Sequence, residues 1–495
     1  MKTLSAQSSL SLRRAIHLSG LGLFMLCANA GCASAQQAWV PVWADEFDGN
    51  SLNLFNWEAQ IGTGPSGDGW GNNELEYYTS RAQNVTVGNG MLTITARQEN
   101  YNGRQYTSAR LRTQGKRDFK YGRFEARAKV PSGQGLWPAF WMLPTNSPYG
   151  GWASSGEIDI LETINLATAV YGTIHYGAPY PGNVSTGGNR PGTWSDGFHV
   201  YAIEWEPDEI RWYVDGVRYN RVTSSTWYST LGAGNDRAPF DVQFHFLLNL
   251  AVGGNWPGNP NASTTFPATF QVDYVRASQR PPQGPYAGTP PTLPAHIEAE
   301  NYDVGGGSVA YKDNDPENVG NQYRTQEAVD IETCAEGGFN VGWFAPGEWI
   351  EYTVNVPAAG IYSLRLRGAT PNAGASYKIS VAGVDKTSNV SVPATTGWQA
   401  YRTASANVSL SAGVQHLRLT NTGTSDLNVN WLEVLVPGDV NADGLRTVDD
   451  VYALQSGEGP YLDVNGDGTG GTAADISTLI NPLRANEPAQ LTPGN

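Results

Sequence analysis

The chain has 495 residues, too many for a single hydrophobic core, so we expect about three domains. Charged residues make up only 16%, while 58 glycines, 30 prolines and 16 tryptophans indicate an all-β, extracellular protein rich in turns. The formal net charge of −15 argues against nucleic acid or an anionic membrane as a partner and suits a neutral polymer.

The first 35 residues have the pattern of a signal peptide. A lysine and two arginines precede an apolar run over 15–30, and Ala33–Ala35 offers a small-residue cleavage site. We therefore expect residues 1–35 to be removed and the protein to be secreted. Only Cys334 would remain of the three cysteines, so a disulfide framework is excluded.

Residues 38–278 read as a run of short strands. Apolar residues alternate with polar ones over 91–96, 124–130, 200–205 and 210–214, between clusters of glycine, asparagine and proline. Strands at this spacing, with almost no helical period, predict a two-sheet β-sandwich. The concave face of a curved sandwich can hold a polysaccharide.

Residues 155–162 (SGEIDILE) alternate acids with aliphatic residues, which predicts a strand with one wet face. Glu157 and Asp159 would share that face, whereas Glu162 would point into the core, where an unpaired carboxylate is costly. A β-bulge at Ile160-Leu161 would return Glu162 to the wet face. Two carboxyl groups about 5–5.5 Å apart are what a retaining glycosidase needs. From spacing alone, a solvated strand face is the other interpretation.

Five motifs, in order along the chain, resemble glycoside hydrolase family 16 in its laminarinase (endo-β-1,3-glucanase) branch. They are 71–79 (GNNELEYYT), 135–144 (GLWPAFWMLP), 156–162 (GEIDILE), 172–176 (GTIHY) and 249–258 (NLAVGGNWPG). The resemblance covers essentially the whole of the predicted domain. It implies a β-jelly-roll with a substrate cleft and retention of anomeric configuration.

The resemblance also implies roles for the three acids. Glu157 would be the nucleophile, Glu162 the acid/base and Asp159 the assistant between them. Glu157 must be ionised to attack, whereas Glu162 must hold a proton, and partial burial beside negative charge favours that protonated form. The bulged spacing favours a laminarinase over a mixed-linkage glucanase, although agarases of the family share it.

Six further residues match positions that line the cleft in such enzymes: Asn73, Arg110, Trp137, Trp141, His175 and Trp256. At least one tryptophan of the 137/141 pair is expected to be a core residue. His175 is expected to donate a hydrogen bond near the acids, with a structural histidine as the alternative. Trp256 lies in a glycine-rich loop and is expected to stack on sugar.

The family's structural calcium site is matched by Glu46 and Asp273, near the two ends of the domain. Ordinary surface acids are the alternative for both. A proline-rich segment, 279–294, then predicts a semi-stiff linker.

Residues 295–436 resemble a carbohydrate-binding module of family 6, through 297–302 (IEAENY), 340–352 (NVGWFAPGEWIEY), 396–399 and 427–431. The resemblance implies a second β-sandwich. Trp343 and Trp398 would clamp a sugar ring, with Asn428 and Glu332 bonding its hydroxyl groups. A structural calcium site would include Glu298 and Glu300. The tryptophans at 349 and 431 lie in strand patterns and are expected in the core.

The tail, 438–495, contains two calcium-loop patterns. The first places Asp439, Asn441, Asp443 and Asp450 at positions 1, 3, 5 and 12, with glycine at position 6. The second begins with Asp463, Asn465 and Asp467, but its twelfth residue is Ala474, and the acid follows one residue later.

With short helices expected at 451–454 and 476–480, the tail resembles a dockerin, a small α-helical, EF-hand-like domain. That resemblance implies structural Ca²⁺ and a cohesin-type scaffold protein as partner. A calcium-stabilised terminal cap is the alternative.

These observations predict a secreted, retaining endo-β-1,3-glucanase that hydrolyses laminarin-like β-glucans by double displacement, with no cofactor for catalysis. One alternative is the same fold acting on agarose or mixed-linkage β-glucan. Another is a non-catalytic glucan-binding protein, which would have no reason to keep both Glu157 and Glu162.

Overall fold

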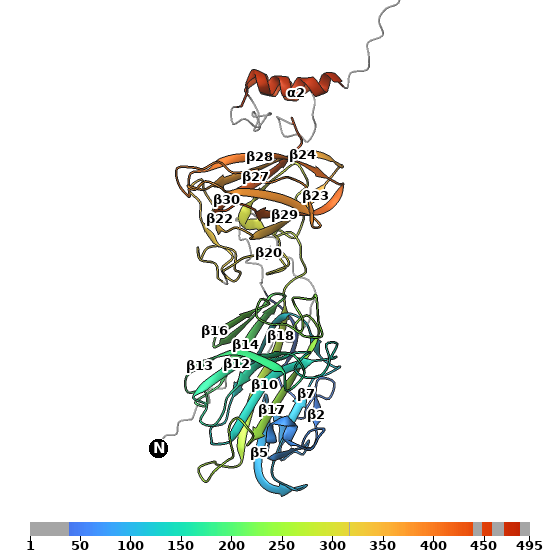
Figure 1. Cartoon of the computed structure of the whole chain (residues 1–495), viewed down its shortest axis with the longest axis vertical. Coiled ribbons are helices and arrows are strands. Elements are labelled where there is room, and N and C mark those ends of the chain that lie inside the picture. The colour runs from blue at the N-terminus through green and yellow to red at the C-terminus, as the bar shows by residue number, and fades with distance from the viewer. Residues whose placement is uncertain (1–38, 316, 439–447, 458–469, 486–495) are drawn as a thin grey trace, which may run out of the picture. The chain divides into compact units, whose positions relative to one another are not determined.

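The computed structural model describes residues 39–315, 317–438, 448–457 and 470–485 (Figure 1). Most described residues that have regular structure are in strands, as predicted. The predicted signal peptide lies outside these ranges, and so do six of the predicted calcium ligands, namely Asp439, Asn441, Asp443, Asp463, Asn465 and Asp467. In the described ranges, every helix is too short or too polar to span a lipid bilayer.

The first β-sandwich confirms the predicted jelly-roll class, and one of its sheets has ten strands. Their order is β16 (Val217–Thr223), β15 (Glu209–Val214), β14 (His199–Glu206), β9 (Gly122–Lys129), β18 (Ala268–Gln279), β5 (Met91–Tyr101), β6 (Arg104–Ser108) and β3 (Glu76–Tyr78). Two more strands pair outside this path, β1 (Val40–Asp45) with β18 and β4 (Val85–Gly88) with β5.

The second sheet of this sandwich has eight strands. Their order is β13 (Asn183–Pro191), β12 (Ala169–Gly177), β11 (Glu157–Glu162), β10 (Leu136–Pro144), β17 (Phe244–Val252), β7 (Arg110–Arg112) and β2 (Glu58–Gln60), with β8 (Asp118–Phe119) beside β17. Figure 1 labels β12, β10 and β17 of this sheet, in which β11 lies between β12 and β10.

Strand β17 shows how this sheet separates a core from a cleft. All nine of its residues are buried, yet only every second one joins the hydrophobic core, beginning with Phe244 and Phe246. The intervening residues, among them His245 and Asn249, point to the opposite face. The sheet therefore carries buried polar groups on the face that the acids of β11 share.

The predicted β-bulge is confirmed. Between β11 and β12, Asp159 faces Thr173 and Glu162 faces Tyr171, so three residues of β11 span two of β12. The intervening residues 160 and 161 are fully buried in the core. Glu162 therefore lies on the same side of the sheet as Asp159.

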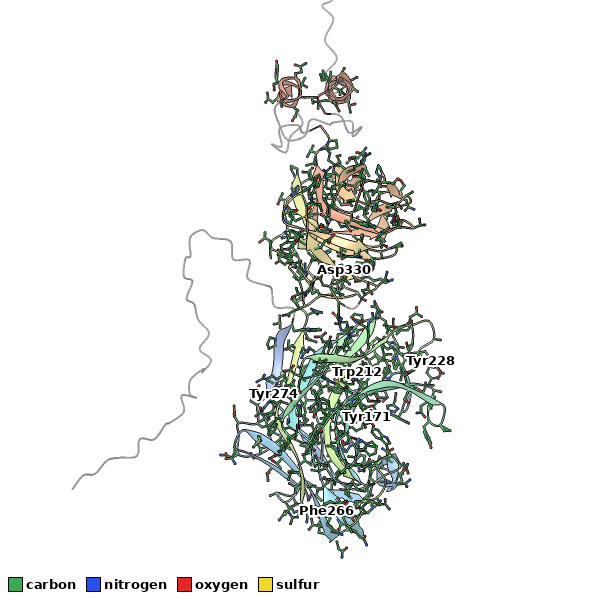
Figure 2. The ribbon with its side chains drawn as sticks, turned by 90° about the vertical axis from the view of Figure 1, so that its left-hand side faces the viewer. Tyr171, Trp212, Tyr228, Phe266, Tyr274 and Asp330 are labelled. Atoms are coloured by element: carbon green, nitrogen blue, oxygen red, sulfur yellow. The ribbon has the colours of Figure 1, made fainter. Side chains whose placement is uncertain are left out.

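A tryptophan from the opposite sheet supports this bulge. Trp212, labelled in Figure 2, is fully buried and donates its indole N–H to the Asp159 carbonyl oxygen at 2.7 Å. The ring passes against Gly172 of β12, where a Cβ atom would lie 2.2 Å from Trp212 Cδ1. Only glycine leaves room for this contact, so Gly172 and Trp212 together hold the acid-bearing strand in place.

The second β-sandwich, over the predicted module, has two six-stranded sheets. One is β21 (Ile331–Thr333), β22 (Phe339–Phe344), β30 (Leu427–Leu435), β24 (Gly360–Ala369) and β28 (Arg402–Leu410), with β19 (Ala295–Glu298) on β30. The other is β20 (Tyr311–Lys312), β23 (Trp349–Val356), β29 (Gly413–Asn421), β25 (Ser376–Val381) and β26 (Val384–Asp385), with β27 (Val390–Ser391) on β25.

Two expectations for the module's interior are wrong. Trp349 and Trp431 are half-buried and lie outside its hydrophobic core. Arg418 stacks over the ring of Trp349 at 3.6 Å, and His296 packs against Trp431 at 5.2 Å. These rings cover polar neighbours on the outer faces of the sheets. Cys334 is a free, buried residue that packs with Ala369 and Tyr401, as an apolar side chain would.

The tail contains the two helices expected there, α1 (Val448–Ser456) and α2 (Ala473–Ala485). Leu454 and Leu479 form the small hydrophobic contact between them. Asp450, the predicted twelfth residue of the first loop, is fully buried, as is Asp475 of the second. Thr472 donates both its backbone N–H and its hydroxyl to Asp475 at the start of α2.

Candidate active site

Strand β11 places three carboxylates on the cleft face of the eight-stranded sheet. Glu157 and Glu162 are half-buried, whereas Asp159 between them is almost fully enclosed. Each glutamate accepts one indole N–H at 2.9 Å, from Trp152 to Glu157 and from Trp137 to Glu162. Each glutamate is therefore oriented by an aromatic side chain that donates a single hydrogen bond to it.

Crowding and burial make these carboxyl groups hold protons more tightly. Burial, with the charge of Asp159 beside it, raises the pKa of Glu157 to about 7. Burial and the same neighbour raise the pKa of Glu162 well above its ordinary value. Above about pH 7 the site thus favours an ionised Glu157 beside a Glu162 that is held toward its protonated form, which is the asymmetry that a retaining glycosidase requires.

His175 of β12 lies beside the acids, where the sequence placed it. Its Nε2 is 3.3 Å from Asp159 Oδ2 and 3.8 Å from Glu157 Oε1. Burial alone would lower the pKa of His175, but its contact with Asp159 and the charge of Glu157 raise it to about 10. His175 is therefore a cation that offsets part of the charge of the three acids.

Aromatic rings flank both glutamates. On the Glu162 side, Trp137 packs edge-on against Trp256 at 5.4 Å, and Trp256 packs against Tyr171, labelled in Figure 2, at 5.0 Å. Trp256 keeps 41% of its surface exposed, which suits the predicted stacking on a sugar. The sequence analysis did not predict Tyr171 as a member of this cluster. Tyr171 lies opposite Glu162 only through the pairing of β11 with β12, which the sequence does not specify.

On the Glu157 side, the sequence missed Trp152. Its ring is 40% exposed, donates to Glu157, and lies 5.6 Å from His175 and 6.2 Å from Tyr180. Trp152 precedes the acids in a loop with no strand pattern, so only the fold brings it to Glu157. An indole N–H on Glu157 steadies its ionised form.

Arg110 lies in the cleft, buried between two rings. Its guanidinium stands 4.3 Å from the centre of Trp70 and 4.7 Å from that of Trp141, and its Nε donates to Gln60 at 2.7 Å. The expectation that at least one of Trp137 and Trp141 would be a core residue is wrong. Both are half-buried on the cleft face, because strand alternation sends their neighbours Leu136 and Phe140 to the core instead.

A buried network beneath the cleft was also missed. Glu74 and Glu76 are both buried, and burial together with the charge of Glu74 holds the pKa of Glu76 well above its ordinary value. Tyr78 donates to Glu74 at 3.0 Å, Asn249 donates to Tyr78 at 3.2 Å, and Trp141 donates to Asn249 at 2.7 Å. A buried carboxyl pair is thereby connected to a cleft tryptophan. The sequence feature that could have predicted this network is the pair of acids two residues apart in the motif GNNELEYYT.

The remaining predicted residues of this domain, Asn73, Glu46 and Asp273, each contact a different partner. Asn73 donates to Asn255 at 2.9 Å, next to Trp256 in the chain. Glu46 forms an ion pair with Arg276 at 2.7 Å, and Asp273 forms one with Arg127 at 2.6 Å. Because each of these two carboxylates serves a different arginine, the pair as arranged does not fit a shared Ca²⁺, and that site stays a prediction.

In the module, the four predicted sugar contacts lie together. Trp343 and Trp398 are 43% and 38% exposed, and Asn428 connects them: it accepts the Trp343 backbone N–H at 3.3 Å and donates to the Trp398 carbonyl at 3.0 Å. Asn428 also donates to Glu332 Oε1 at 2.7 Å. Gln399, which the sequence did not single out, donates to the same oxygen at 2.8 Å. Two exposed rings therefore flank a fully hydrogen-bonded polar floor.

The predicted module calcium site contains a buried carboxylate oxygen without a partner. Glu300 is 5% exposed, its Oε2 accepts no hydrogen bond among the described residues, and burial raises its pKa to about 7. His296 lies 3.2 Å from Glu298 and 3.2 Å from Glu433. An orphaned carboxylate oxygen near further acids fits a bound Ca²⁺, which takes oxygen ligands.

A β-sandwich cleft in which three carboxyl groups share one face between aromatic rings is the arrangement of a glycoside hydrolase. Residues 72–276 match the model for Glycosyl hydrolases family 16, and residues 319–435 match that for Carbohydrate binding module (family 6). The chain belongs to glycosyl hydrolases family 16, and it carries a family 6 module.

Part of the chain is similar in sequence to known proteins. The chain is 46% identical over 253 residues to "Glucan endo-1,3-beta-glucosidase A1" of Niallia circulans, covering 48% of this chain and 37% of that protein. It is 45% identical over 266 residues to "Beta-glucanase" of Rhodothermus marinus, covering 52% of this chain and 91% of that protein. The crystal structure of the laminarinase from Rhodothermus marinus is 46% identical, covers 48% of this chain and 97% of its own, and has a TM-score of 0.44.

Proposed function

We propose that the chain is a secreted, retaining endo-β-1,3-glucanase that cuts laminarin-like glucans. The observation that carries the proposal is the β-bulge, which brings Glu157, Asp159 and Glu162 onto one face of the cleft. The named activities of its relatives support the β-1,3-glucan as substrate.

In the first half of the reaction, ionised Glu157 attacks the anomeric carbon of the bound sugar. As the glycosidic bond breaks, Glu162 gives its proton to the leaving oxygen, and a covalent glycosyl-Glu157 ester remains. Trp152 releases its hydrogen bond to Glu157 or shifts it to the remaining carboxyl oxygen. Cationic His175, close to both Asp159 and Glu157, steadies the changing charge.

In the second half, Glu162, now ionised, takes a proton from water. The water oxygen attacks the anomeric carbon from the side that the leaving group vacated, and the ester bond to Glu157 breaks. Two inversions at one carbon give net retention. Glu157 is again ionised and Glu162 again protonated, so each group ends as it began.

Three further parts of the proposal concern the rest of the chain. The signal-peptide pattern of residues 1–35 supports export. The unpaired oxygen of Glu300 and the paired loop patterns of the tail support structural Ca²⁺. The resemblance of the tail to a dockerin supports a cohesin-type scaffold partner; pull-down with a panel of cohesins, with and without a calcium chelator, tests that partner.

The catalytic assignment is tested with Glu157→Ala and laminarin. This variant should lose hydrolysis by roughly 10⁴-fold, and sodium azide should restore part of it by forming a glycosyl azide at the vacated position. Analysis of the product anomer separates the pathways, because azide attack in the Glu157→Ala variant gives the opposite configuration. Turnover at the unsubstituted rate would refute the nucleophile.

A family member with the same acids could instead cut agarose or mixed-linkage glucan. Product analysis on laminarin, lichenan and agarose side by side decides among them. Predominant cleavage of agarose or lichenan would replace the proposed substrate while leaving the mechanism in place.

A further inference from the structure

A cavity of about 260 Å³ opens beside the catalytic cleft, and none of the steps above uses it. Among the residues that line it are Gln60, Arg112, Gln114, Leu143, Trp152 and His245. Its volume lies just below the roughly 300–1,000 Å³ typical of pockets that enclose a whole small ligand. It therefore suits one side group of a larger substrate.

Strand register places this cavity to one side of the reacting centre. Trp141 pairs with Asp159 on one neighbouring strand and with Leu247 on the other. Two residues further along the same strands, Leu143 pairs with His245, and both line the cavity. This displacement is toward the Glu157 end of β11, away from Glu162 and its aromatic cluster. The cavity is thus a lateral chamber next to the nucleophile.

The chamber is polar but carries no uncompensated charge. The Arg112 guanidinium donates to Glu58 at 3.2 Å, so its charge is already paired. Burial, with Arg112 and Arg110 nearby, lowers the pKa of His245 to about 3, so the imidazole is neutral. None of the described residues that line the chamber is acidic. A charged group would find no counter-ion there, whereas hydroxyl groups find donors and acceptors.

The lining also offers apolar surface of the kind on which a sugar ring rests. Half-buried Leu143 and Trp152, which is 40% exposed, both line the chamber. Gln114 donates its amide to the Thr145 carbonyl at 2.8 Å, which fixes that side chain and presents its carbonyl oxygen to another donor.

We propose that this chamber binds a single neutral sugar branch, a glucosyl unit attached to the glucan main chain near the point of cleavage. The inference rests on the proposed function, because it assumes that the main chain crosses the acids of β11. The enzyme would then accept a branched β-1,3-glucan with the branch seated beside Glu157, rather than stopping at each branch point.

The test compares two substrates that share a main chain: a linear β-1,3-glucan hexasaccharide and the same hexasaccharide with one β-1,6-linked glucosyl branch. Ser147 lines the chamber and is exposed at its rim, so Ser147→Trp fills the space without disturbing the core. Asn146→Trp, at the exposed neighbouring residue outside the lining, is the matched control.

The unsubstituted protein should cut both substrates with kcat/KM values within about threefold of each other. Ser147→Trp should lower kcat/KM for the branched substrate at least about tenfold and leave the linear substrate unchanged, because it removes the space and the hydrogen bonds that a branch uses. Asn146→Trp should change neither value.

The outcomes separate the two hypotheses. The branch chamber is wrong, while the glucanase activity stands, if Ser147→Trp lowers kcat/KM equally for both substrates or leaves kcat/KM for the branched substrate unchanged. It is also wrong if the unsubstituted protein cuts the linear substrate but cannot cut the branched one. Failure of the unsubstituted protein to cut even the linear hexasaccharide would overturn the proposed function itself.

Discussion

The catalytic cleft and the binding face of the module use the same kinds of residue in different electrostatic settings. Each is the face of a β-sandwich, with partly exposed tryptophans around half-buried glutamates. In the module, one oxygen of Glu332 accepts from three amide nitrogens, those of Asn428, Gln399 and Asn340. In the cleft, Glu157 and Glu162 each accept one indole N–H, and Asp159 stands between them.

This contrast distinguishes a site that binds from a site that reacts. A carboxylate oxygen that already accepts three hydrogen bonds is a weaker base and a weaker nucleophile than one that accepts a single bond. Carboxyl groups that are crowded together and under-solvated keep high proton affinity, and that is what acid and nucleophile roles require. The number of donors around each acid therefore predicts which β-sandwich does chemistry.

The strongest test of this difference replaces one glutamate by the isosteric glutamine in the cleft and, separately, one in the module. Glu157→Gln should lower kcat on laminarin by roughly 10³–10⁴-fold, because an amide is a very poor nucleophile. Glu332→Gln should leave kcat on a short soluble oligosaccharide unchanged, since Glu332 lies in the module. Steady-state kinetics with both variants measures the difference.

Circular dichroism of each variant serves as the control for folding. If Glu332→Gln slowed hydrolysis of the short oligosaccharide as strongly as Glu157→Gln, the division between a reacting site and a binding site would be wrong.

A second prediction concerns the tryptophans of the two faces. Trp343→Ala should weaken binding to insoluble β-glucan about 30-fold, as expected for the loss of a stacking ring at a binding hot spot, while kcat on short oligosaccharides stays constant. Trp256→Ala should instead raise KM on those oligosaccharides about tenfold. Adsorption isotherms and initial rates separate the two effects. Unchanged adsorption of Trp343→Ala would remove the module's face as the glucan site.

The pH dependence of the cleft follows from its raised pKa values. The proposed mechanism needs ionised Glu157, and the pKa of that group is raised to about 7 by burial and by the charge of Asp159. Activity should therefore fall as the pH drops through about 7, approaching about tenfold per pH unit below it. Plots of kcat/KM against pH from about 4 to about 9 test this. The Trp343 and Trp398 rings do not titrate, so their stacking on glucan should not follow the same curve. A flat kcat/KM profile down to about pH 5 would contradict the raised pKa.

The sequence predicted the parts of this comparison that depend on local pattern. Alternation of acids and aliphatic residues, together with the cost of burying Glu162, was enough to predict the bulge at 160 and 161. The same reasoning failed for Trp137 and Trp141, because an apolar run was taken as core although strand alternation exposes every second residue.

The site residues that the sequence analysis missed are placed by contacts between segments that are distant in the chain. Trp152 reaches Glu157 from an irregular loop, and Tyr171 faces Glu162 only through the register of β12. Partners set by register or by loop closure leave no periodic signal in the chain. The chamber around His245 is of this kind, since its walls come from segments as distant in the chain as Gln60 and His245.

The smallest expected effects are changes in thermal stability when Glu162 of the cleft and Glu332 of the module are each replaced by glutamine. The folded-state pKa of Glu162 is raised above its ordinary value by burial and by Asp159. Between those two values the native state binds more protons than the unfolded state, so stability falls as the pH rises. Glu162→Gln removes this loss and should raise Tm at about pH 7 by roughly 2–5 °C. At about pH 4, where the carboxyl group is largely protonated in both states, the gain should largely vanish.

Glu332→Gln should have the opposite sign, because the uncharged amide oxygen that replaces Oε1 accepts more weakly than a carboxylate from Asn428, Gln399 and Asn340. A loss of about 1 kcal/mol is the usual result of disrupting such bonds, which lowers Tm by a few degrees for a module of this size. Differential scanning calorimetry of both variants at about pH 4 and about pH 7 tests both signs. If Glu162→Gln lowered Tm at the higher pH, the carboxyl group would be stabilising the fold, and the cleft and the module would no longer differ in how they hold their acids.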